Sequence, residues 1–308
     1  MLKIFFLKLL IILISIALVV GFFEYNLAKI PTSYNIKKSN IEKEASEIQV
    51  LILGSSDAIG GINPAFFSKE AFNMADSSQS LYYDLKIFSK YSSQLKNLRV
   101  LIIPVTYLSL QYNFDESLES WRSFFYDRTY GIPQRKKSRW IDVRAHSLFA
   151  LYGQQRSLFY ALKGFKMNLA PDIFENGYQK IDGSNIASLN ESGGKLAVDI
   201  HESEMDPQYF SENVDYLNQM IRIAKEINAT PVIVTPPVSH FYSANIDKNV
   251  YMQMVSTIEE ISRQQKVKYL NYFYDSHFSI EDFLDPHHVN SMGAEKFTKI
   301  LDKEIFGK

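Results

Sequence analysis

Residues 49–54 read QVLILG, an apolar run that ends at a glycine, and this stretch decides the fold class. Similar short runs recur at 71–74, 99–103, 230–235 and 267–270, with helical spacing of apolar residues between them. Nearly continuous apolar strands that alternate with helices are typical of a parallel sheet covered on both faces. With one strand for each run, we expect an α/β fold: a three-layer α/β/α sandwich around a five-stranded, mostly parallel sheet.

The composition excludes several classes of function. The chain has 308 residues and is 46% hydrophobic, so it is long enough to bury a full core. Its formal net charge is -1, without the basic excess of a protein that binds nucleic acid, and we expect no nucleic-acid partner. It contains no cysteine, which excludes disulfides, thiolate nucleophiles and iron–sulfur clusters.

The N-terminal segment predicts a membrane anchor. Residues 9–23 (LLIILISIALVVGFF) carry no charge, and about 20 apolar residues span a bilayer. Lys3 and Lys8 precede most of the run and Glu24 follows it, so the positive-inside rule places the N-terminus in the cytoplasm. The remainder would then be extracytoplasmic, in a periplasm or at a cell surface. A cleaved signal peptide is the alternative, although no A-x-A-like site follows the run.

We expect a tethered domain that carries an insertion. Residues 1–24 are the anchor or signal segment, 25–47 a polar juxtamembrane linker, and 48–308 the α/β domain. Residues 108–210 interrupt the alternation of strands and helices, and they are far too long for an ordinary connection. This segment predicts a helical insertion over one end of the sheet.

The insertion is rich in aromatic and basic residues. It holds both tryptophans, Trp121 and Trp140, and a basic group made of Arg135, Lys136, Lys137 and Arg139. The aromatic rings could stack on sugars and the basic group could contact anionic lipid or glycan. The structural alternatives are a core within the insertion and a solvated loop. Our hypothesis is that the insertion walls the site and selects the acceptor.

Candidate catalytic residues lie near the two ends of the α/β portion. Ser55 and Ser56 follow Gly54 directly after the first strand, where α/β sheets place their ligands. A turn and a helix cap are the structural alternative for this pair of serines. Asp285 and His288 are three residues apart, so both side chains can face the same side. A carboxylate bonded to one imidazole nitrogen leaves the other nitrogen free as a base.

Two cofactor-dependent alternatives are disfavoured. Beside His287 and His288 the chain offers no cysteine and only His277 nearby, so a zinc ligand set is incomplete. Gly54, Gly60 and Gly61 follow a strand, with Asp76 after the next one, which suggests a dinucleotide site. Their spacing is not G-x-G-x-x-G, however. We expect neither a metal nor a cofactor.

These motifs resemble the SGNH (GDSL-type) hydrolase family. Residues 54–56 (GSS) are similar to its Gly-Asp-Ser block, with Ser56 in the nucleophile's place. Residues 285–288 (DPHH) match its final Asp-x-x-His block, and Asn290 and Gly293 fit the tail that follows there. A Gly-Ser-Ser version is familiar in exported, membrane-anchored relatives, including the D-alanyl-transfer protein of teichoic acid and alginate O-acetylation proteins. The resemblance covers residues 48–107 and 210–306 but not the insertion.

The resemblance implies roles for particular residues. Ser56 would be the nucleophile, His288 the base and Asp285 the orienting acid. The backbone N–H groups of Ser56 and Ser78 would form the oxyanion hole, although the family usually has glycine where Ser78 stands. The family's third block, Gly-x-Asn-Asp, is missing, because residues 103–107 read IPVTY. Thr106 or Tyr107 is left to offer a hydroxyl as the third oxyanion donor.

The function that follows is O-acyl transfer. The resemblance implies a serine-dependent esterase or acyltransferase, and export implies a substrate such as an acylated cell-envelope polysaccharide. The alternative is a non-catalytic member of the fold that binds a glycan or a membrane-bound acyltransferase. The absent Asn favours that alternative, whereas the presence of Ser56, Asp285 and His288 disfavours it.

Overall fold

The computed structural model describes residues 1–135, 142–152, 173–180 and 186–307, in two compact units. The first unit comprises Met1–Thr32 and Trp121–Pro171, and the second comprises Ser33–Ser120 and Asp172–Lys308. The expected insertion is therefore divided between them. Trp140, Lys136, Lys137 and Arg139, to which we assigned glycan or lipid contacts, lie outside the described residues.

The first unit contains the apolar N-terminal helix. Its described residues form the helices α1 (Leu2–Leu27), α5 (Ser123–Tyr130) and α6 (Leu148–Leu151), with 3-10 turns at Ser120–Arg122, where its second segment begins, and at Val143–Ala145. Helix α1 is long and apolar enough to cross a membrane, and within the described ranges no other helix is. The carboxylate of Glu24, near the end of α1, accepts hydrogen bonds from the backbone N–H of Leu148 (2.9 Å) and Phe149 (3.1 Å). These bonds hold the first turn of α6 against the end of the apolar helix.

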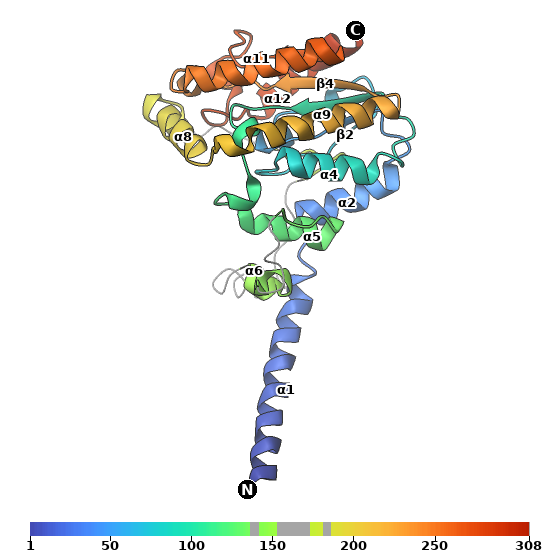
Figure 1. Ribbon diagram of the computed structural model, residues 1–308, viewed down its shortest axis with the longest axis vertical. Helices are drawn as coiled ribbons and strands as arrows, with labels where there is room; N and C mark the ends of the chain where they lie inside the picture. Colours follow the sequence, from blue (N-terminus) through green and yellow to red (C-terminus); the bar gives the residue numbers. More distant parts are fainter. Residues whose placement is uncertain (136–141, 153–172, 181–185, 308) are drawn as a thin grey trace. The chain divides into compact units, whose positions relative to one another are not determined.

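The second unit is built on a five-stranded parallel sheet (Figure 1). The strands are β1 (Val50–Ile52), β2 (Ala71–Asn73), β3 (Val100–Pro104), β4 (Thr230–Thr235) and β5 (Lys268–Asn271), in the order β2-β1-β3-β4-β5. Every pairing is parallel, and Leu51 is in register with Phe72 on one side and Leu101 on the other. Each of the five apolar runs forms a strand, so the expected fold class is confirmed.

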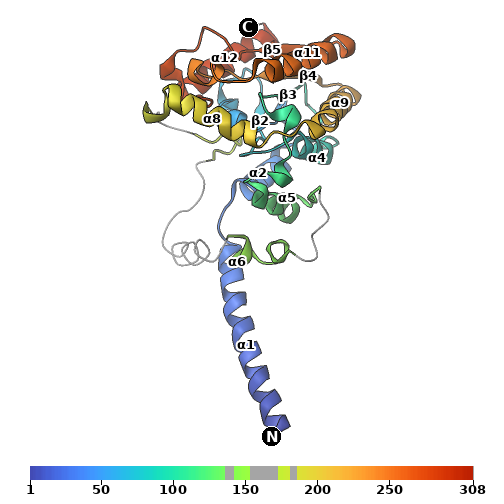
Figure 2. The same ribbon diagram turned by 60° about the vertical axis from the view of Figure 1, so that its left-hand side comes forward.

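Helices cover both faces of this sheet. The described helices of this unit are α2 (Ser33–Glu44), α3 (Ser56–Ile59), α4 (Leu81–Tyr91), α8 (Glu191–Ser203), α9 (Phe210–Glu226), α10 (His240–Ser243), α11 (Lys248–Gln265) and α12 (Ser291–Phe306). Short 3-10 turns lie at Pro64–Phe66, Ser109–Gln111, Phe114–Glu116, Ile186–Ser188, Pro207–Tyr209 and Ile280–Asp282. In Figure 2 the strands lie between α12 on one side and the α4–α9 pair on the other.

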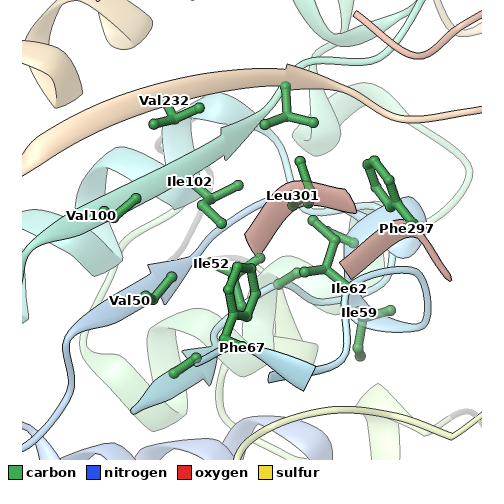
Figure 3. Packing of buried hydrophobic residues seen from close by; sticks show 14 of the residues in the cluster. Val50, Ile52, Ile59, Ile62, Phe67, Val100, Ile102, Val232, Phe297 and Leu301 are labelled. Atoms are coloured by element: carbon green, nitrogen blue, oxygen red, sulfur yellow. The ribbon is translucent and has the colours of Figure 1, made fainter. Parts of the chain in front are cut away.

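Alternation of side chains along the strands divides the core. Val50, Ile52, Val100 and Ile102 point to one face, where they pack with side chains of α12 and of the segment after α3 (Figure 3). The strand residues between them, such as Leu51 and Leu101, are also fully buried. Burial on both faces explains why these strands read as continuous apolar runs.

The helix that leads to β4 does not start at either of its nearby capping-type residues. Ser211 and Asn213 are residue types that commonly cap helices, but α9 already begins at Phe210, after a 3-10 turn capped by Asp206. Asn213 lies inside α9 and is fully buried. Its side-chain amide donates to the carbonyls of Leu110 (3.1 Å) and Tyr112 (3.0 Å) instead of capping its own helix. A tertiary contact therefore overrides the local capping preference.

The segment that we expected as a linker contains ordered structure. Residues Ser33–Glu44 form α2, and Tyr34, Lys37 and Ile41 on this helix are buried. The ammonium group of Lys37 donates a hydrogen bond to the carbonyl of Ala75. Helix α2 thus packs against the loop that follows β2.

Candidate active site

Ser56 lies on a sharp turn at the carboxyl end of β1. Gly54 has φ +113°, and a Cβ atom there would lie 2.9 Å from Cγ of Pro104 on β3, so both the backbone conformation and the space require glycine. Ser55 is extended and precedes α3, and its hydroxyl donates to Oδ2 of Asp57 (2.9 Å). Ser56 is the first residue of α3. The turn therefore presents the Ser56 hydroxyl beyond the edge of the sheet.

A buried carboxyl group holds this turn. Oδ1 of Asp84, on α4, accepts hydrogen bonds from the Gly54 N–H (2.8 Å) and from Nε2 of Gln79 (2.6 Å). Burial raises the pKa of Asp84 to about 7, although both hydrogen bonds act in the opposite direction. Near neutral pH, Asp84 is therefore part protonated and part ionised.

The histidine loop is held by the start of α12. Asn290 caps that helix by accepting from Met292 N and Gly293 N (3.0 and 3.1 Å), and its amide donates back to the Glu281 carbonyl (2.7 Å). A Cβ on Gly293 would lie 2.2 Å from the Asp282 carbonyl oxygen, so glycine is needed for this close approach. The tail that resembles the SGNH family thus shapes the loop that carries Asp285 and His288.

The structure brings Ser56, His288 and Asp285 together in a hydrogen-bonded chain. Nε2 of His288 lies 2.8 Å from the Ser56 hydroxyl, and Nδ1 lies 2.8 Å from Oδ2 of Asp285. The other carboxylate oxygen accepts from the backbone N–H groups of His287 and His288 (3.0 and 2.9 Å). Because Asp285 accepts at Nδ1, the proton of neutral His288 belongs on Nδ1, and Nε2 is left to take a proton from Ser56.

The charges around His288 favour its protonated form. Burial lowers the pKa of His288, but the hydrogen bond to Asp285 and the charges of Asp57 and Asp285 outweigh it, so the pKa is raised. Burial opposes ionisation of Asp285, yet its bond to His288 holds the Asp285 pKa below the usual range. This electrostatic arrangement stabilises the imidazolium that forms when a serine is deprotonated.

Ser78 occupies a backbone conformation that usually belongs to glycine. Its φ is 60°, in the left-handed region, at the place where the resembled family has glycine. No group in the described part of the chain accepts a hydrogen bond from its backbone N–H, and the residue lines the same cavity as Ser56. An N–H group in this position can donate to an oxygen bound at the site.

The two hydroxyl candidates for a third donor differ. Thr106 lines the cavity, but its N–H donates to the Ser109 hydroxyl (2.8 Å), and the two hydroxyls share a hydrogen bond (2.9 Å). The Tyr107 hydroxyl donates to Glu202 (2.7 Å) and accepts from Asp247 N (2.9 Å). Tyr107 is thus fully engaged elsewhere, whereas Thr106 remains a candidate.

Sequence reasoning missed His201, which lines the cavity together with Ser56, Ser78 and Thr106. It comes from α8, within the expected insertion, where the resemblance offered no residue to compare. One signal was present: Gly194, Val198 and His201 follow helical spacing, and the first two are buried, so His201 falls on the inner side of α8. Nδ1 of His201 lies 2.6 Å from the Tyr242 hydroxyl.

His287 lies between the rings of His201 and His288. The ring centroids are 4.6 Å and 3.8 Å away, respectively. Nδ1 of His287 lies 3.3 Å from Asp285 without a hydrogen bond, and it is fully buried. Burial, together with the neighbouring histidines, holds the pKa of His287 well below its usual range, so this ring is neutral. Its role is to pack between the other two histidine rings.

Asp285, His287 and His288 also raise the question of a metal ion. Each offers one ligand atom, and these atoms lie within 4.8 Å of one another. Both ring nitrogens of His288 already have partners, in Asp285 and Ser56. A metal bound here would therefore displace the hydrogen bond to Ser56 or to Asp285.

Gly61, one of the glycines that suggested a dinucleotide site, is needed for close packing. A Cβ on Gly61 would lie 2.0 Å from the Asp57 carbonyl oxygen and 3.3 Å from Val289. Asp76, suggested as a ribose ligand, is 4% exposed, and its Oδ1 accepts from the backbone N–H of Ser77. Neither residue offers the open backbone or carboxylate that a dinucleotide would bind.

Fold and site together define an α/β protein with a serine, a histidine and an aspartate in hydrogen-bond contact at one end of a parallel sheet. Residues 136–304 match the family described as "Protein of unknown function (DUF1574)", and the chain belongs to that family. No curated protein matches the sequence.

Two solved structures resemble the chain weakly. One is a proposed acylhydrolase from Bacteroides fragilis, with a TM-score of 0.44, 11% identity, and coverage of 87% of this chain and 95% of that one. The other is a GDSL-like lipase from Bacteroides thetaiotaomicron, with a TM-score of 0.43, 11% identity, and coverage of 90% and 99%. At these TM-scores the likeness supports no conclusion about activity, which has to rest on the residues of this chain.

Proposed function

We propose that this protein is a serine-dependent O-acyl esterase or O-acyltransferase. The observation that carries the proposal is the chain of two 2.8 Å hydrogen bonds from the Ser56 hydroxyl through His288 to Asp285. A hydroxyl in this arrangement is activated as a nucleophile, because the imidazole takes its proton and the carboxylate stabilises the resulting cation.

The reaction would proceed in two steps, acylation of Ser56 and its deacylation. Oγ of Ser56 forms a bond to the ester carbonyl carbon while Nε2 of His288 takes the serine proton, and the carbonyl π electrons move to its oxygen. The backbone N–H groups of Ser56 and Ser78 would donate to that oxyanion. The C–O bond to the alcohol then breaks, and the alcohol leaves with the proton from His288. In the second step, water or a sugar hydroxyl attacks the acyl carbon and gives its proton to His288. The bond to Oγ of Ser56 then breaks, and the serine takes the proton back from His288.

The location of the chain favours a cell-envelope substrate. If α1 anchors the chain with its C-terminal part outside the cytoplasm, the site meets acylated envelope polysaccharide before cytoplasmic esters. A membrane-bound acyltransferase would be a natural partner for transfer in that compartment. A comparison of envelope-glycan acylation by mass spectrometry, with and without the gene, tests this substrate class. An unchanged acylation pattern would contradict it.

The nucleophile is tested with two adjacent serines. Ser56→Ala should reduce turnover of p-nitrophenyl acetate by roughly 10³-fold or more, because no other hydroxyl contacts His288 within the described residues. Ser55→Ala is the matched control and should cost much less, because the Ser55 hydroxyl bonds to Asp57 instead. A fluorophosphonate probe should label the wild type and Ser55→Ala but not Ser56→Ala. Full activity of Ser56→Ala would overturn the proposal.

The base is tested with two adjacent histidines. His288→Ala should be far more harmful to turnover than His287→Ala, since His288 alone of the two bonds to Ser56. His287→Ala should mainly lower thermal stability, because it removes a half-buried ring that packs between two other histidines. Equal losses of turnover in variants that remain folded would contradict the assignment.

A non-catalytic role is the second candidate, and the missing Asn of the third block favours it. Such a protein would bind a glycan or a membrane-bound acyltransferase without turnover. It would fail to react with the fluorophosphonate and would show the same background hydrolysis as Ser56→Ala. Probe labelling that depends on Ser56 would exclude this candidate.

A further inference from the structure

We infer that His201, on helix α8, is the third oxyanion donor, in place of the Asn that the third block lacks. The inference rests on the proposed acyl-transfer function and names a further residue that would touch the reacting atoms. His201, Ser56 and Ser78 line the same cavity, and this observation supports the assignment.

The hydrogen bond to Tyr242 fixes which nitrogen of His201 carries the proton. Burial raises the pKa of Tyr242 well above its usual value, so the hydroxyl keeps its proton. Within the described residues, the only partner of this hydroxyl is Nδ1 of His201, at 2.6 Å. A buried O–H with a single neighbour donates to it, because an unused donor would cost about 1–3 kcal/mol. Nδ1 is therefore the acceptor, and the proton of His201 sits on Nε2.

The Nε2–H group is free to donate into the cavity. Among the residues that the structure describes, none accepts a hydrogen bond from it, and it is not one of the enclosed polar atoms. His201 lines both the Ser56 cavity and a second cavity that Tyr242 also lines, and its Nδ1 edge is the one bonded to Tyr242. We therefore assign the Nε2 edge to the Ser56 side.

The charge state of His201 suits a donor that must not exchange its proton. Burial lowers its pKa, against the smaller opposing effect of the Asp57 charge, so the ring stays neutral at neutral pH. A neutral imidazole N–H polarises a carbonyl oxygen and keeps its proton throughout. In the tetrahedral intermediate the Nε2–H would donate to the oxyanion alongside the N–H groups of Ser56 and Ser78, while His288 carries out the proton transfer.

The test compares four variants of the full chain in detergent, with p-nitrophenyl acetate as substrate and Ser56→Ala as the reference for lost catalysis. His201→Ala should lower kcat by about 10²-fold and leave KM within about twofold, because the bond exists only in the transition state. Tyr242→Phe, which keeps the ring and removes only the hydroxyl, should lower kcat by about tenfold, because Nδ1 can then carry the proton. His240→Ala is the matched control, an exposed histidine outside the cavity, and should be unchanged. Thr106→Val removes the competing hydroxyl and distinguishes the two candidate donors.

The outcomes separate this inference from the proposed function. Wild-type kcat in His201→Ala, with Ser56→Ala inactive, overturns the His201 assignment and leaves the function standing. A loss in Thr106→Val alone assigns the donor to Thr106 instead. If His201 only supported the catalytic histidine, its removal would shift the midpoint of the acid limb of the pH–rate profile, and such a shift would also overturn the inference. Full activity of Ser56→Ala overturns the function itself.

Discussion

The Asp84 carboxylate accepts a hydrogen bond from the N–H of Gly54 at 2.8 Å, which joins helix α4 to the turn that presents Ser56. Both residues are fully enclosed, and Gly54 is held at a φ of +113°. The position of the proposed nucleophile thus depends on an ionisable group whose own charge is costly to bury.

This dependence predicts a pH effect on stability. The pKa of Asp84 is about 7 in the folded protein, above the ordinary 3.8, so the folded state holds a proton that the unfolded state has lost between these values. The contribution of Asp84 to stability is present at low pH and disappears as pH rises through about 7. Asp84→Asn, which keeps an acceptor oxygen, should therefore gain in melting temperature relative to the wild type between pH 5 and pH 8.

The measurement is thermal unfolding at several pH values. A difference of one kcal/mol corresponds to about 2–4 °C for a domain of this size. Asp199→Asn is the matched control, because Asp199 is exposed on α8, and its difference from the wild type should not change with pH. Parallel curves for Asp84→Asn and the wild type would show that Asp84 is ionised throughout.

The raised pKa of His288 predicts the shape of the pH–rate profile. A general base must be neutral, so turnover should rise with pH through the pKa of His288, with a midpoint above 6.5. Asp57→Asn removes one of the charges that raise this pKa and keeps an oxygen for the Ser55 hydroxyl. Its midpoint should move to lower pH, as measured from kcat/KM across pH 5–9. A midpoint that stays in place would mean that Asp57 does not act on His288.

Helix α2 should stabilise the loop that contains Ser78. Lys37→Met removes the donor to the Ala75 carbonyl and the cation that faces buried Asp76. Leaving the buried Ala75 carbonyl without its donor costs about 1–3 kcal/mol, so the melting temperature should fall. Lys38→Met is the control, because Lys38 is 39% exposed and its ion pair with Glu42 is long, at 3.9 Å. Equal melting temperatures for the two variants would contradict a structural role for Lys37.

Gly293 should be essential for the histidine loop. Gly293→Ala would place a methyl group 2.2 Å from the Asp282 carbonyl oxygen, so the loop or the start of α12 must move. We expect both a lower melting temperature and a loss of fluorophosphonate labelling, since a shift of about 1 Å in a catalytic group costs about 10² in rate. Met292→Ala, at the exposed neighbouring position, should affect neither. Normal labelling of Gly293→Ala would refute this role.

The proposed orientation is tested with reporters. Lys3 and Lys8 precede most of the apolar run in α1, so the rest of the chain should lie outside the cytoplasm. A reporter that is active only after export, fused after residue 308, should be active, and a reporter that works only in the cytoplasm should be silent. The reverse pattern would overturn the orientation. Intact-mass measurement would decide whether residues 1–23 are retained.

The inner strands of the sheet were readable from the sequence because they are buried on both faces. Such strands have no polar side, so Gln49–Leu53 and Arg99–Ile103 stand out as apolar runs without help from tertiary structure. The pairing of Ser56 with His288 was predicted from the resemblance of residues 54–56 and 285–288 to two blocks of the SGNH family.

Other parts of the site were not readable, because they depend on contacts between distant segments. The pair of His201 and Tyr242 joins residues 41 positions apart, in two segments whose relative placement no spacing predicts. Asp84 looks like an ordinary acidic residue in the first turn of a helix until the fold places Gly54 against it. The role of Asn213 likewise depends on the fold, because this residue of a capping type donates to two distant carbonyls.

The 232 residues that separate Ser56 from His288 have a consequence for synthesis. Ribosomes make Ser56 well before His288, so for an interval a growing chain carries the proposed nucleophile without its proposed base. During this interval no base activates the Ser56 hydroxyl, so under the proposed mechanism it would not react with esters. Under the proposed mechanism, any chain that stops before Asp285 would stay inactive, so premature termination or C-terminal clipping would yield an inactive protein and not an enzyme of altered specificity.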